Sequence, residues 1–378
     1  MEPAPRAAEV PAAHAAVYGG DPDPVEMTPE EAAIVARLEE EGPLGCAIDA
    51  RLVRAARRHA AALASSDRSP SEADMDHLRF AVLAEGGTDY LLTPFAVRDL
   101  ETGRPALAAF IAEHRREVTH CGVGTARTGA RDVAVWVGSR RAVDIDAVPV
   151  VREVGAAQTV TGRATGAEGA VRAFLGLPDG SAIALEVRAQ GGGAFAVTVP
   201  FERPGRYDLE IQIDLGGGPE TASLLPLYAG TQPDTRPTVA AADADAGPTA
   251  IGNEAPDAQL FALVNAARKR LGVATLVRDE RLDGVARTHS ADMVALGYFG
   301  HRSPGGAMLA DRLRALGLRP SAFGENVARS SSAMRVHRNL MSSPSHRIEL
   351  LSRSYTHMGI GVARDGDDLV VTEVLARW

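Results

Sequence analysis

Three short segments near the C-terminus carry side chains that could bind a metal or transfer a proton. His301 begins the motif HRSP, Glu325 is the centre of GEN, and His346 belongs to SPSHR. Two neutral imidazoles and one carboxylate can bind Zn²⁺ and leave a position for water. Without a metal, the same groups can act as a base and its orienting partner, or they can form a hydrogen-bonded cluster that holds loops in place. The residue types leave these three alternatives open.

All three residues, His301, Glu325 and His346, are candidate catalytic groups, and the two histidines are the candidate zinc ligands. Side chains next to this trio are candidate ligand-binding groups: Arg302, Ser303, Asn326 and Ser343. Other catalytic motifs, namely H-E-x-x-H, G-x-S-x-G and a P-loop, do not occur in the sequence. The trio therefore carries the functional prediction.

Helices and a hairpin are expected to position the trio. Apolar residues recur at helical spacing in three segments: 260–271, 282–296 and 309–316. His289 lies on the apolar stripe of the second segment, so we expect a hydrogen-bonded core histidine. Apolar strands are expected at 358–362 and 369–375, and Asp365-Gly366 between them predicts a hairpin.

An earlier part of the chain repeats this order of elements. The run THCGVGTAR, from Thr119, matches THMGIGVAR, from Thr356. The glycine pair in each run lies on an expected strand and is expected to permit close packing there, rather than to bind a dinucleotide. His120 and His357, which recur at the start of these strands, are expected to share a packing or hydrogen-bonding role.

The repeat predicts that residues 28–145 are a degenerate copy of residues 257–378. Helices are expected from Thr28 and over 49–64, strands over 122–126 and 133–137, and irregular structure between 65 and 121. This copy lacks the trio. Ala109 aligns with His346, and Glu85 is only a loose counterpart of Glu325.

The region between the two copies has a different pattern. Short apolar segments are separated by Gly- and Pro-containing turns: 171–177, 183–187, 195–201 and 207–213. This spacing predicts an immunoglobulin-like β-sandwich over residues 146–231. Residues 232–256, rich in Pro, Ala and Asp, are expected to be a disordered linker, and residues 1–27 a flexible lead-in.

The order and spacing of the C-terminal motifs resemble the CAP superfamily, which groups cysteine-rich secretory, antigen 5 and pathogenesis-related proteins. The likeness is to its bacterial SCP-like branch, and it covers residues 257–378. The resemblance implies a three-layer α-β-α sandwich and a cleft with two histidines and two acidic residues. His301, Glu325 and His346 match three of these positions, and the fourth, normally Glu, falls at or near Ser343. The expected fold is thus multidomain α+β, with two CAP-like sandwiches flanking an immunoglobulin-like one.

Composition narrows the class of protein. The chain has 378 residues and a net charge of −9, which disfavours nucleic-acid partners. No apolar stretch is long enough to span a membrane. The first 20 residues lack the apolar run of an intact signal peptide. The two cysteines, Cys46 and Cys121, could form one disulfide in an exported protein or remain as two buried thiols.

We expect an extracytoplasmic protein, secreted or in the cell envelope, since the family is mostly found there. Its C-terminal cleft is expected to bind a lipid, glycan or peptide, with the other domains as spacers or interaction modules. The alternative is a hydrolase that uses the trio, with or without zinc. Replacement of the fourth acidic residue by Ser343 weakens that alternative.

Overall fold

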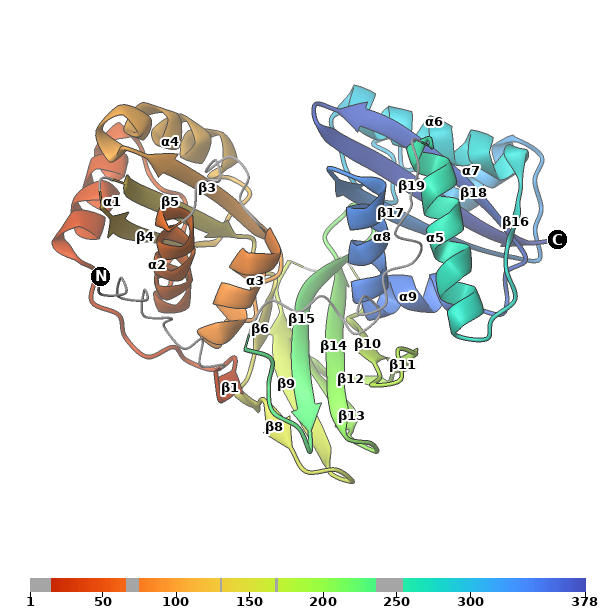
Figure 1. Ribbon diagram of the computed structural model, residues 1–378, viewed down its shortest axis with the longest axis horizontal. Coiled ribbons are helices and arrows are strands. Elements are labelled where there is room, and N and C mark those ends of the chain that lie inside the picture. The colour runs from red at the N-terminus through yellow and green to blue at the C-terminus, as the bar shows by residue number, and fades with distance from the viewer. Residues whose placement is uncertain (1–14, 66–74, 130, 167–168, 236–253) are drawn as a thin grey trace, which may run out of the picture. The chain divides into compact units, whose positions relative to one another are not determined.

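The computed structural model describes residues 15–65, 75–129, 131–166, 169–235 and 254–378 (Figure 1). The chain divides into two compact units. The first comprises Met1–Glu153 and Gly230–Thr238, and the second comprises Val154–Ala229 and Val239–Trp378. Most of the predicted lead-in and linker, at 1–14 and 236–253, lies outside the described residues. Of the described helices, none is long and apolar enough to cross a lipid bilayer.

The first unit is built around a four-stranded sheet in the order β2-β4-β5-β3. Its strands are β2 (Ala47–Ile48), β3 (Leu92–Arg98), β4 (His120–Thr128) and β5 (Arg131–Ser139). β2 runs parallel to β4, and the other pairs are antiparallel. The shorter strands are β1 (Val17–Tyr18), which pairs with β7 (Val148–Pro149), and β6 (Val143–Ile145) and β8 (Val151–Arg152).

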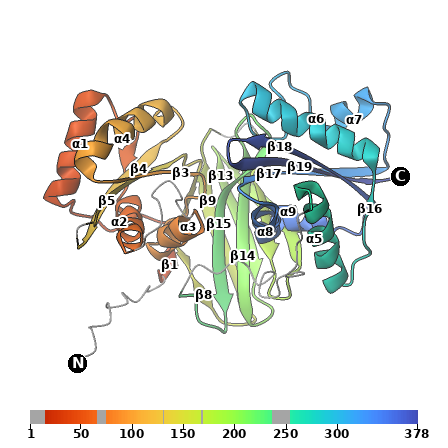
Figure 2. The ribbon, with the colours of Figure 1, turned by 45° about the horizontal axis from the view of Figure 1, so that its top comes forward.

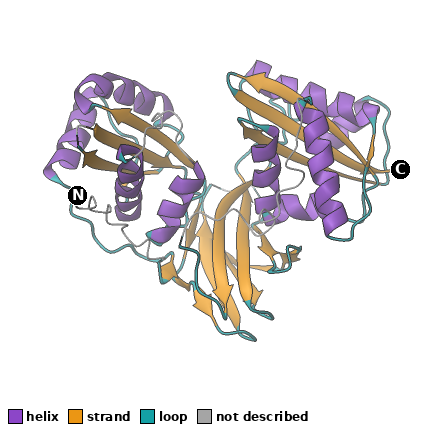
Figure 3. Cartoon of the chain, in the orientation of Figure 1, coloured by secondary structure: helices purple, strands orange, loops and turns teal. Residues whose placement is uncertain are grey.

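Helices cover both faces of this sheet (Figures 2 and 3). One apolar cluster joins it to α2 (Ala50–Ala64) and α3 (Met75–Ala84), and another joins it to α1 (Pro29–Glu41) and α4 (Leu100–His114). The predicted start of α1 is confirmed, because the Thr28 hydroxyl accepts the Glu31 N–H and Glu31 accepts the Thr28 N–H.

The expectation of irregular structure between residues 65 and 121 is wrong. That stretch contains α3, β3 and α4. The sequence obscures α4 because Gly103 and Pro105 stand inside it. Both residues sit in its first turns, and Asp99 accepts the exposed N–H groups there as the N-cap. Tertiary burial of Leu107 and Ile111 then stabilises the helix.

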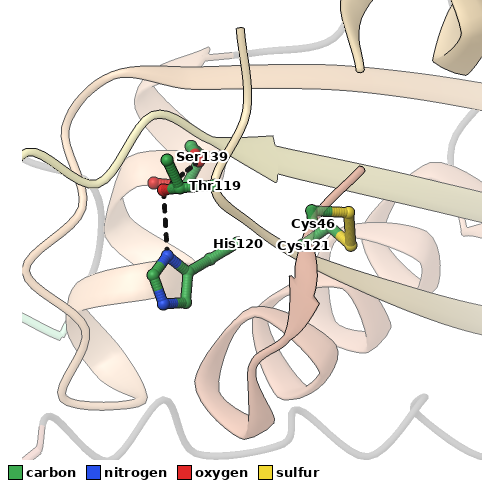
Figure 4. The surroundings of a disulfide bond; sticks show 5 residues. All are labelled: Cys46, Thr119, His120, Cys121 and Ser139. Atoms are coloured by element: carbon green, nitrogen blue, oxygen red, sulfur yellow. Dashed lines mark hydrogen bonds between the residues drawn. A yellow bond between two sulfur atoms is a disulfide. The ribbon is translucent and has the colours of Figure 1, made fainter. Parts of the chain in front are cut away.

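Cys46, just before β2, and Cys121 of β4 form a disulfide, with their Cα atoms 5.7 Å apart (Figure 4). Of the two alternatives that the sequence left open, the structure therefore has the disulfide. Cys121 is fully buried in the cluster beneath α1 and α4. Closing a loop of 75 residues in sequence separation stabilises the first unit by about 4 kcal/mol in the chain-entropy description.

The second unit begins with two antiparallel sheets. One has the order β11-β10-β14-β15 and the other the order β12-β13-β9. Their bounds are β9 (Ala157–Ala164), β10 (Arg172–Gly176), β11 (Ala182–Leu185), β12 (Val187–Gly191), β13 (Ala194–Pro200), β14 (Gly205–Asp214) and β15 (Pro219–Ala229). The expected strand at 183–187 is thus divided between two sheets. We call these strands the sandwich module; its immunoglobulin-like character stays a proposal.

The rest of the second unit is an α/β layer, residues 254–378, that we call the C-terminal module. Its sheet has the order β16-β18-β19-β17. The strands are β16 (Val277–Arg278), β17 (Ala322–Ser330), β18 (His357–Asp365) and β19 (Asp368–Arg377). The predicted hairpin is confirmed, since Asp365 pairs with Asp368 at the turn between β18 and β19.

Helices again lie on both faces of this sheet (Figure 2). One apolar cluster joins the sheet to α5 (Pro256–Arg270), α8 (Ala333–Ser342) and α9 (Pro344–Leu351). The other joins it to α6 (Glu280–Leu296) and α7 (Leu309–Ala315). The three helices predicted from apolar spacing are confirmed as α5, α6 and α7, whereas α8 and α9 were not foreseen.

The glycine pairs have the packing role predicted for them in both units. A Cβ added at Gly359 would lie 2.2 Å from the backbone of Leu282 in α6, and one at Gly361 would lie 2.1 Å from that of Ala286. At Gly122 and Gly124 the corresponding distances to the backbone of α2 are 2.3 and 2.1 Å. Only glycine lets these helices approach their strands so closely.

Candidate functional site

His301 and Glu325 come together as the sequence predicted. His301 follows α6, and Glu325 lies on β17. The His301 Nδ1 is 3.1 Å from Glu325 Oε1, and Arg312 of α7 donates to Glu325 Oε2 at 2.5 Å. The Glu325 side chain is only 4% exposed. Both of its oxygens are thus hydrogen-bonded inside the C-terminal module.

His346 belongs to a second cluster, at the start of α9. Its Nδ1 lies 2.7 Å from the Ser343 hydroxyl oxygen. That hydroxyl also lies 3.0 Å from each carboxylate oxygen of Glu210, a fully buried residue of β14. The structure therefore places a glutamate of the sandwich module next to the Ser343–His346 pair.

The two clusters differ in how burial acts on their titrating groups. Burial raises the pKa of Glu325, but the His301 hydrogen bond and the Arg312 charge outweigh burial, so the pKa lies below its usual value. Burial lowers the pKa of His346 to about 4, and the charge of Glu210 offsets only part of this effect. His346 is therefore neutral at pH 7 and carries a single ring N–H.

His289 lies behind the site as the core histidine that the sequence predicted. It is fully buried, and its Nε2–H donates to the Gly300 carbonyl at 3.0 Å. Its Nδ1 is 3.3 Å from the Tyr298 hydroxyl, which also reaches Ser303 at 3.2 Å. This chain of contacts fixes the backbone immediately before His301.

The other candidate binding residues have varied surroundings. Arg302 is exposed, and its guanidinium lies 3.8 Å from Asp214. Ser303 is half-buried against Tyr298. Asn326 is fully buried, and its amide donates to Glu373 at 3.5 Å. Ser343 is 3% exposed. The structure therefore brings Ser343 to His346, while Asn326 lies inside the sheet rather than at the surface.

The residues of the trio, as they stand, do not fit a three-ligand zinc site. Both oxygens of Glu325 already bond His301 and Arg312. Within the described part of the chain, no group of three His, Cys, Asp or Glu side chains converges as metal ligands would. Two imidazoles alone fall short of the three protein ligands of a catalytic zinc. Zinc binding by His301 and His346 stays a prediction.

Glu210 is the residue at this site that sequence reasoning missed. The sequence did contain a signal, because Asp208, Glu210 and Gln212 alternate with apolar residues and so share one face of β14. Such a polar face usually meets solvent. Here all three are buried, and Glu210 is contacted by Ser343, which lies 133 residues further along the chain.

Comparisons with known proteins match the C-terminal module. The profile of the family described as "CAP: Cysteine-rich secretory protein family" matches residues 261–375. The "Uncharacterized protein YkwD" of Bacillus subtilis is 34% identical over 105 residues, which are 28% of this chain and 41% of that protein. The "Uncharacterized membrane protein YlbC" of the same species is 36% identical over 107 residues, covering 28% of this chain and 31% of that protein. The chain thus spans less than half the length of either relative.

Among solved structures, an extracellular protein containing an SCP domain from Bacillus anthracis is similar. It is 20% identical, the match covers 51% of this chain and 67% of that chain, and the TM-score is 0.31. The residues matched by the family profile include His301, Glu325 and His346. The C-terminal module of this chain, at residues 261–375, is therefore a CAP domain, the domain of the cysteine-rich secretory protein family.

Proposed function

We propose that the protein is an exported binding protein whose CAP domain holds a glycan or peptide between His301 and His346. The observation that carries this proposal is the way in which both rings are held. Glu325 is ionised and can only accept, so the ring nitrogen of His301 that faces it, Nδ1, carries the hydrogen. When that ring is neutral, the opposite nitrogen, Nε2, has a lone pair.

Lone pairs on neutral imidazoles accept hydrogen bonds from hydroxyl and amide N–H groups. His346 is neutral at pH 7, and His301 lies near enough to interact with it electrostatically. Two acceptors at one site favour a ligand with several donors. Glycans and peptides have this chemistry, whereas a lipid tail would need an apolar lining.

Export is supported by the disulfide. Bonds such as Cys46–Cys121 persist in oxidising compartments and are rare in the reducing cytosol. We therefore place the protein outside the cytoplasm, secreted or in the cell envelope. The first unit is proposed as a degenerate CAP-like domain that acts as a spacer or interaction module, and the sandwich module is proposed as an interaction module.

Calorimetry on the full chain tests the binding proposal. The titrant is a soluble mixture of muropeptides, which combine sugar hydroxyls with peptide amides, and phosphatidylglycerol vesicles serve as the lipid comparison. We expect muropeptide binding that a His301→Ala/His346→Ala variant loses. A matched His120→Ala variant in the first unit should bind like the wild type. Binding to vesicles alone would overturn the choice of glycan or peptide.

A hydrolase is the second candidate. The neutral state of His346 favours it, because an unprotonated imidazole can take a proton from water or a substrate hydroxyl. Release of new reducing ends or amines from the muropeptides, lost in the His346→Ala variant, would support hydrolysis. Zinc titration of the wild type and the double variant tests the metal-dependent form of this reading.

A further inference from the structure

The β14–β15 hairpin of the sandwich module runs along the CAP domain site from one histidine to the other. At one end, Glu210 meets the segment that precedes His346. At the other end, the hairpin turn meets His301: the Arg302 N–H donates to the Gly217 carbonyl at 3.0 Å. A Cβ added at Gly218 would lie 3.0 Å from the Cβ of His301. One hairpin of the sandwich thus contacts both clusters.

The Glu210 side chain has unusually many donors around it. The backbone N–H of Ser345 donates to Oε2 at 2.8 Å, and the Ser345 hydroxyl lies 3.0 Å from Oε1. From its own module, Thr221 donates to Oε1 at 2.5 Å and Gln212 at 3.2 Å. An amide N–H can only donate, so both oxygens act as acceptors. A buried carboxylate with this many partners holds one fixed position.

This arrangement decides the direction of the hydrogen bond to His346. A hydroxyl has one hydrogen. Because Ser343 directs its hydrogen to Glu210, its oxygen must accept from the ring of His346. The hydrogen of the neutral ring is then on Nδ1, and the lone pair is on Nε2. Glu210 thereby fixes the hydrogen of His346 on Nδ1 through Ser343, just as Glu325 fixes the hydrogen of His301 on Nδ1 by direct contact.

We propose that Glu210 is a positioning residue for His346, acting through Ser343, and that the binding site is built jointly by the sandwich module and the CAP domain. The sandwich is then part of the site rather than a spacer. Only one part of this inference rests on the proposed function, namely that the lone pair of His346 faces a ligand. The positioning itself can be measured in the free protein.

The test is the tautomer of His346, read from the ¹⁵N chemical shifts of its ring in the full chain at pH 7. The His346 signals are assigned by their loss in a His346→Gln variant. The wild type should have Nδ1–H. In Glu210→Ala, the Ser343 hydroxyl loses its acceptor and turns to the ring, so the tautomer should reverse to Nε2–H. His301, held by Glu325, should keep Nδ1–H and serves as the internal control.

Two further variants guard against simple loss of structure. Ser343→Ala leaves Glu210 with its other donors and should also abolish the preference for Nδ1–H. Thr221→Val removes a donor to Glu210 that does not touch His346, so the tautomer should stay as in the wild type. Nε2–H in the wild type, or Nδ1–H kept in both Glu210→Ala and Ser343→Ala, would overturn the proposal.

Muropeptide titration of the same samples separates this inference from the proposed function. A reversed tautomer with unchanged binding would uphold the positioning role and refute binding through the lone pair of His346. Lost binding with an unchanged tautomer would refute the positioning role and would uphold binding through the lone pair of His346. If both proposals hold, Glu210→Ala should weaken binding about tenfold, as expected for one hydrogen bond to a ligand.

Discussion

In both α/β layers, a helix lies against a glycine pair of a four-stranded sheet, and the two sheets have the same strand order. Thr119 and Thr356 even make the same 2.9 Å contact to the histidine that follows each of them. The layers differ in what fills the matched positions. That the two layers share an origin stays our proposal. Residues found in both layers are those that the fold requires, and residues found only in the CAP domain are those that a site requires.

Strand register identifies the matched positions. In the CAP domain, Ile360 pairs with Glu373, which pairs with Asn326. In the first unit, Val123 pairs with Trp136, which pairs with Phe95. The first layer thus has a wholly apolar centre where the second has a buried acid and amide. The CAP domain, which contains His301 and His346, thus has polar side chains at core positions that are apolar in the first unit.

Register also corrects one prediction. At the position of Glu325, which pairs with Val374 opposite Gly359, the first unit has Pro94, which pairs with Val137 opposite Gly122. Glu85, the expected loose counterpart, lies after α3 and forms ion pairs with Arg54 and Arg58. No carboxylate therefore occupies the matched strand position in the first layer.

The disulfide should produce the largest difference between the layers. Replacing both cysteines, as Cys46→Ala/Cys121→Ala, should destabilise the first unit by about 4 kcal/mol, because the unfolded chain regains the entropy of a long loop. Urea unfolding, followed by Trp136 fluorescence in a Trp378→Phe background, measures this. The CAP domain contains no cysteine, so its hydrogen exchange should not change. An equal loss in both units would contradict a stabilisation local to the first.

Glu373 should make the CAP domain sensitive to pH. Burial raises its pKa from 4.5 to about 7, and the Asn326 bond offsets little of this. A raised pKa means that the folded state binds the proton more tightly, so its contribution is complete below pH 4.5 and is lost as pH rises through 7. Relative to Glu373→Gln, the wild-type domain should lose about 3 kcal/mol between pH 4.5 and 8.

Hydrogen exchange at several pH values, compared between wild type and Glu373→Gln, checks this. A difference that is constant with pH would show that the carboxyl does not titrate in this range. The first unit, with Trp136 at the matched position, is the internal control, and the variant should leave its pH dependence unchanged.

The glycine pairs should show that the two layers depend on the same close packing. Gly361→Ala and Gly124→Ala each place a Cβ 2.1 Å from helix backbone, so each should cost its own unit about 2 kcal/mol by overpacking. Thermal unfolding of the two variants measures the effect. A loss in one unit alone would break the analogy between them.

Gly284 gives the smallest effect and the opposite sign. It lies inside α6, and a Cβ there would have no neighbour within 4 Å among the described residues. Gly284→Ala should therefore stabilise the CAP domain by about 0.8 kcal/mol through helix propensity. It is the matched control for Gly361→Ala, because Gly361 packs against the backbone of the same helix, α6. Destabilisation by Gly284→Ala would mean that α6 has closer neighbours than described.

Several features of the fold could be predicted from local patterns in the sequence. The Thr28 cap, the Asp365-Gly366 turn and the glycine pairs act over a few residues or through a recognisable repeat, so the sequence alone predicts them. The His301–Glu325 pair followed from motifs kept in order along the chain. Glu210 could not be foreseen, because its partner Ser343 lies far along the chain and only tertiary packing joins them. The disulfide was likewise open until the Cys46–Cys121 separation was known.

One measurement tests most directly whether the site belongs to the CAP domain alone of the two α/β layers. A ring ¹H–¹⁵N spectrum of the full chain can report on all ten histidines while muropeptides are added. We predict that the signals of His301 and His346 shift in a saturable way, while those of His59 and His120 in the first unit do not move. Shifts at His59 or His120, or unchanged signals of His301 and His346 at saturating muropeptide, would contradict this account.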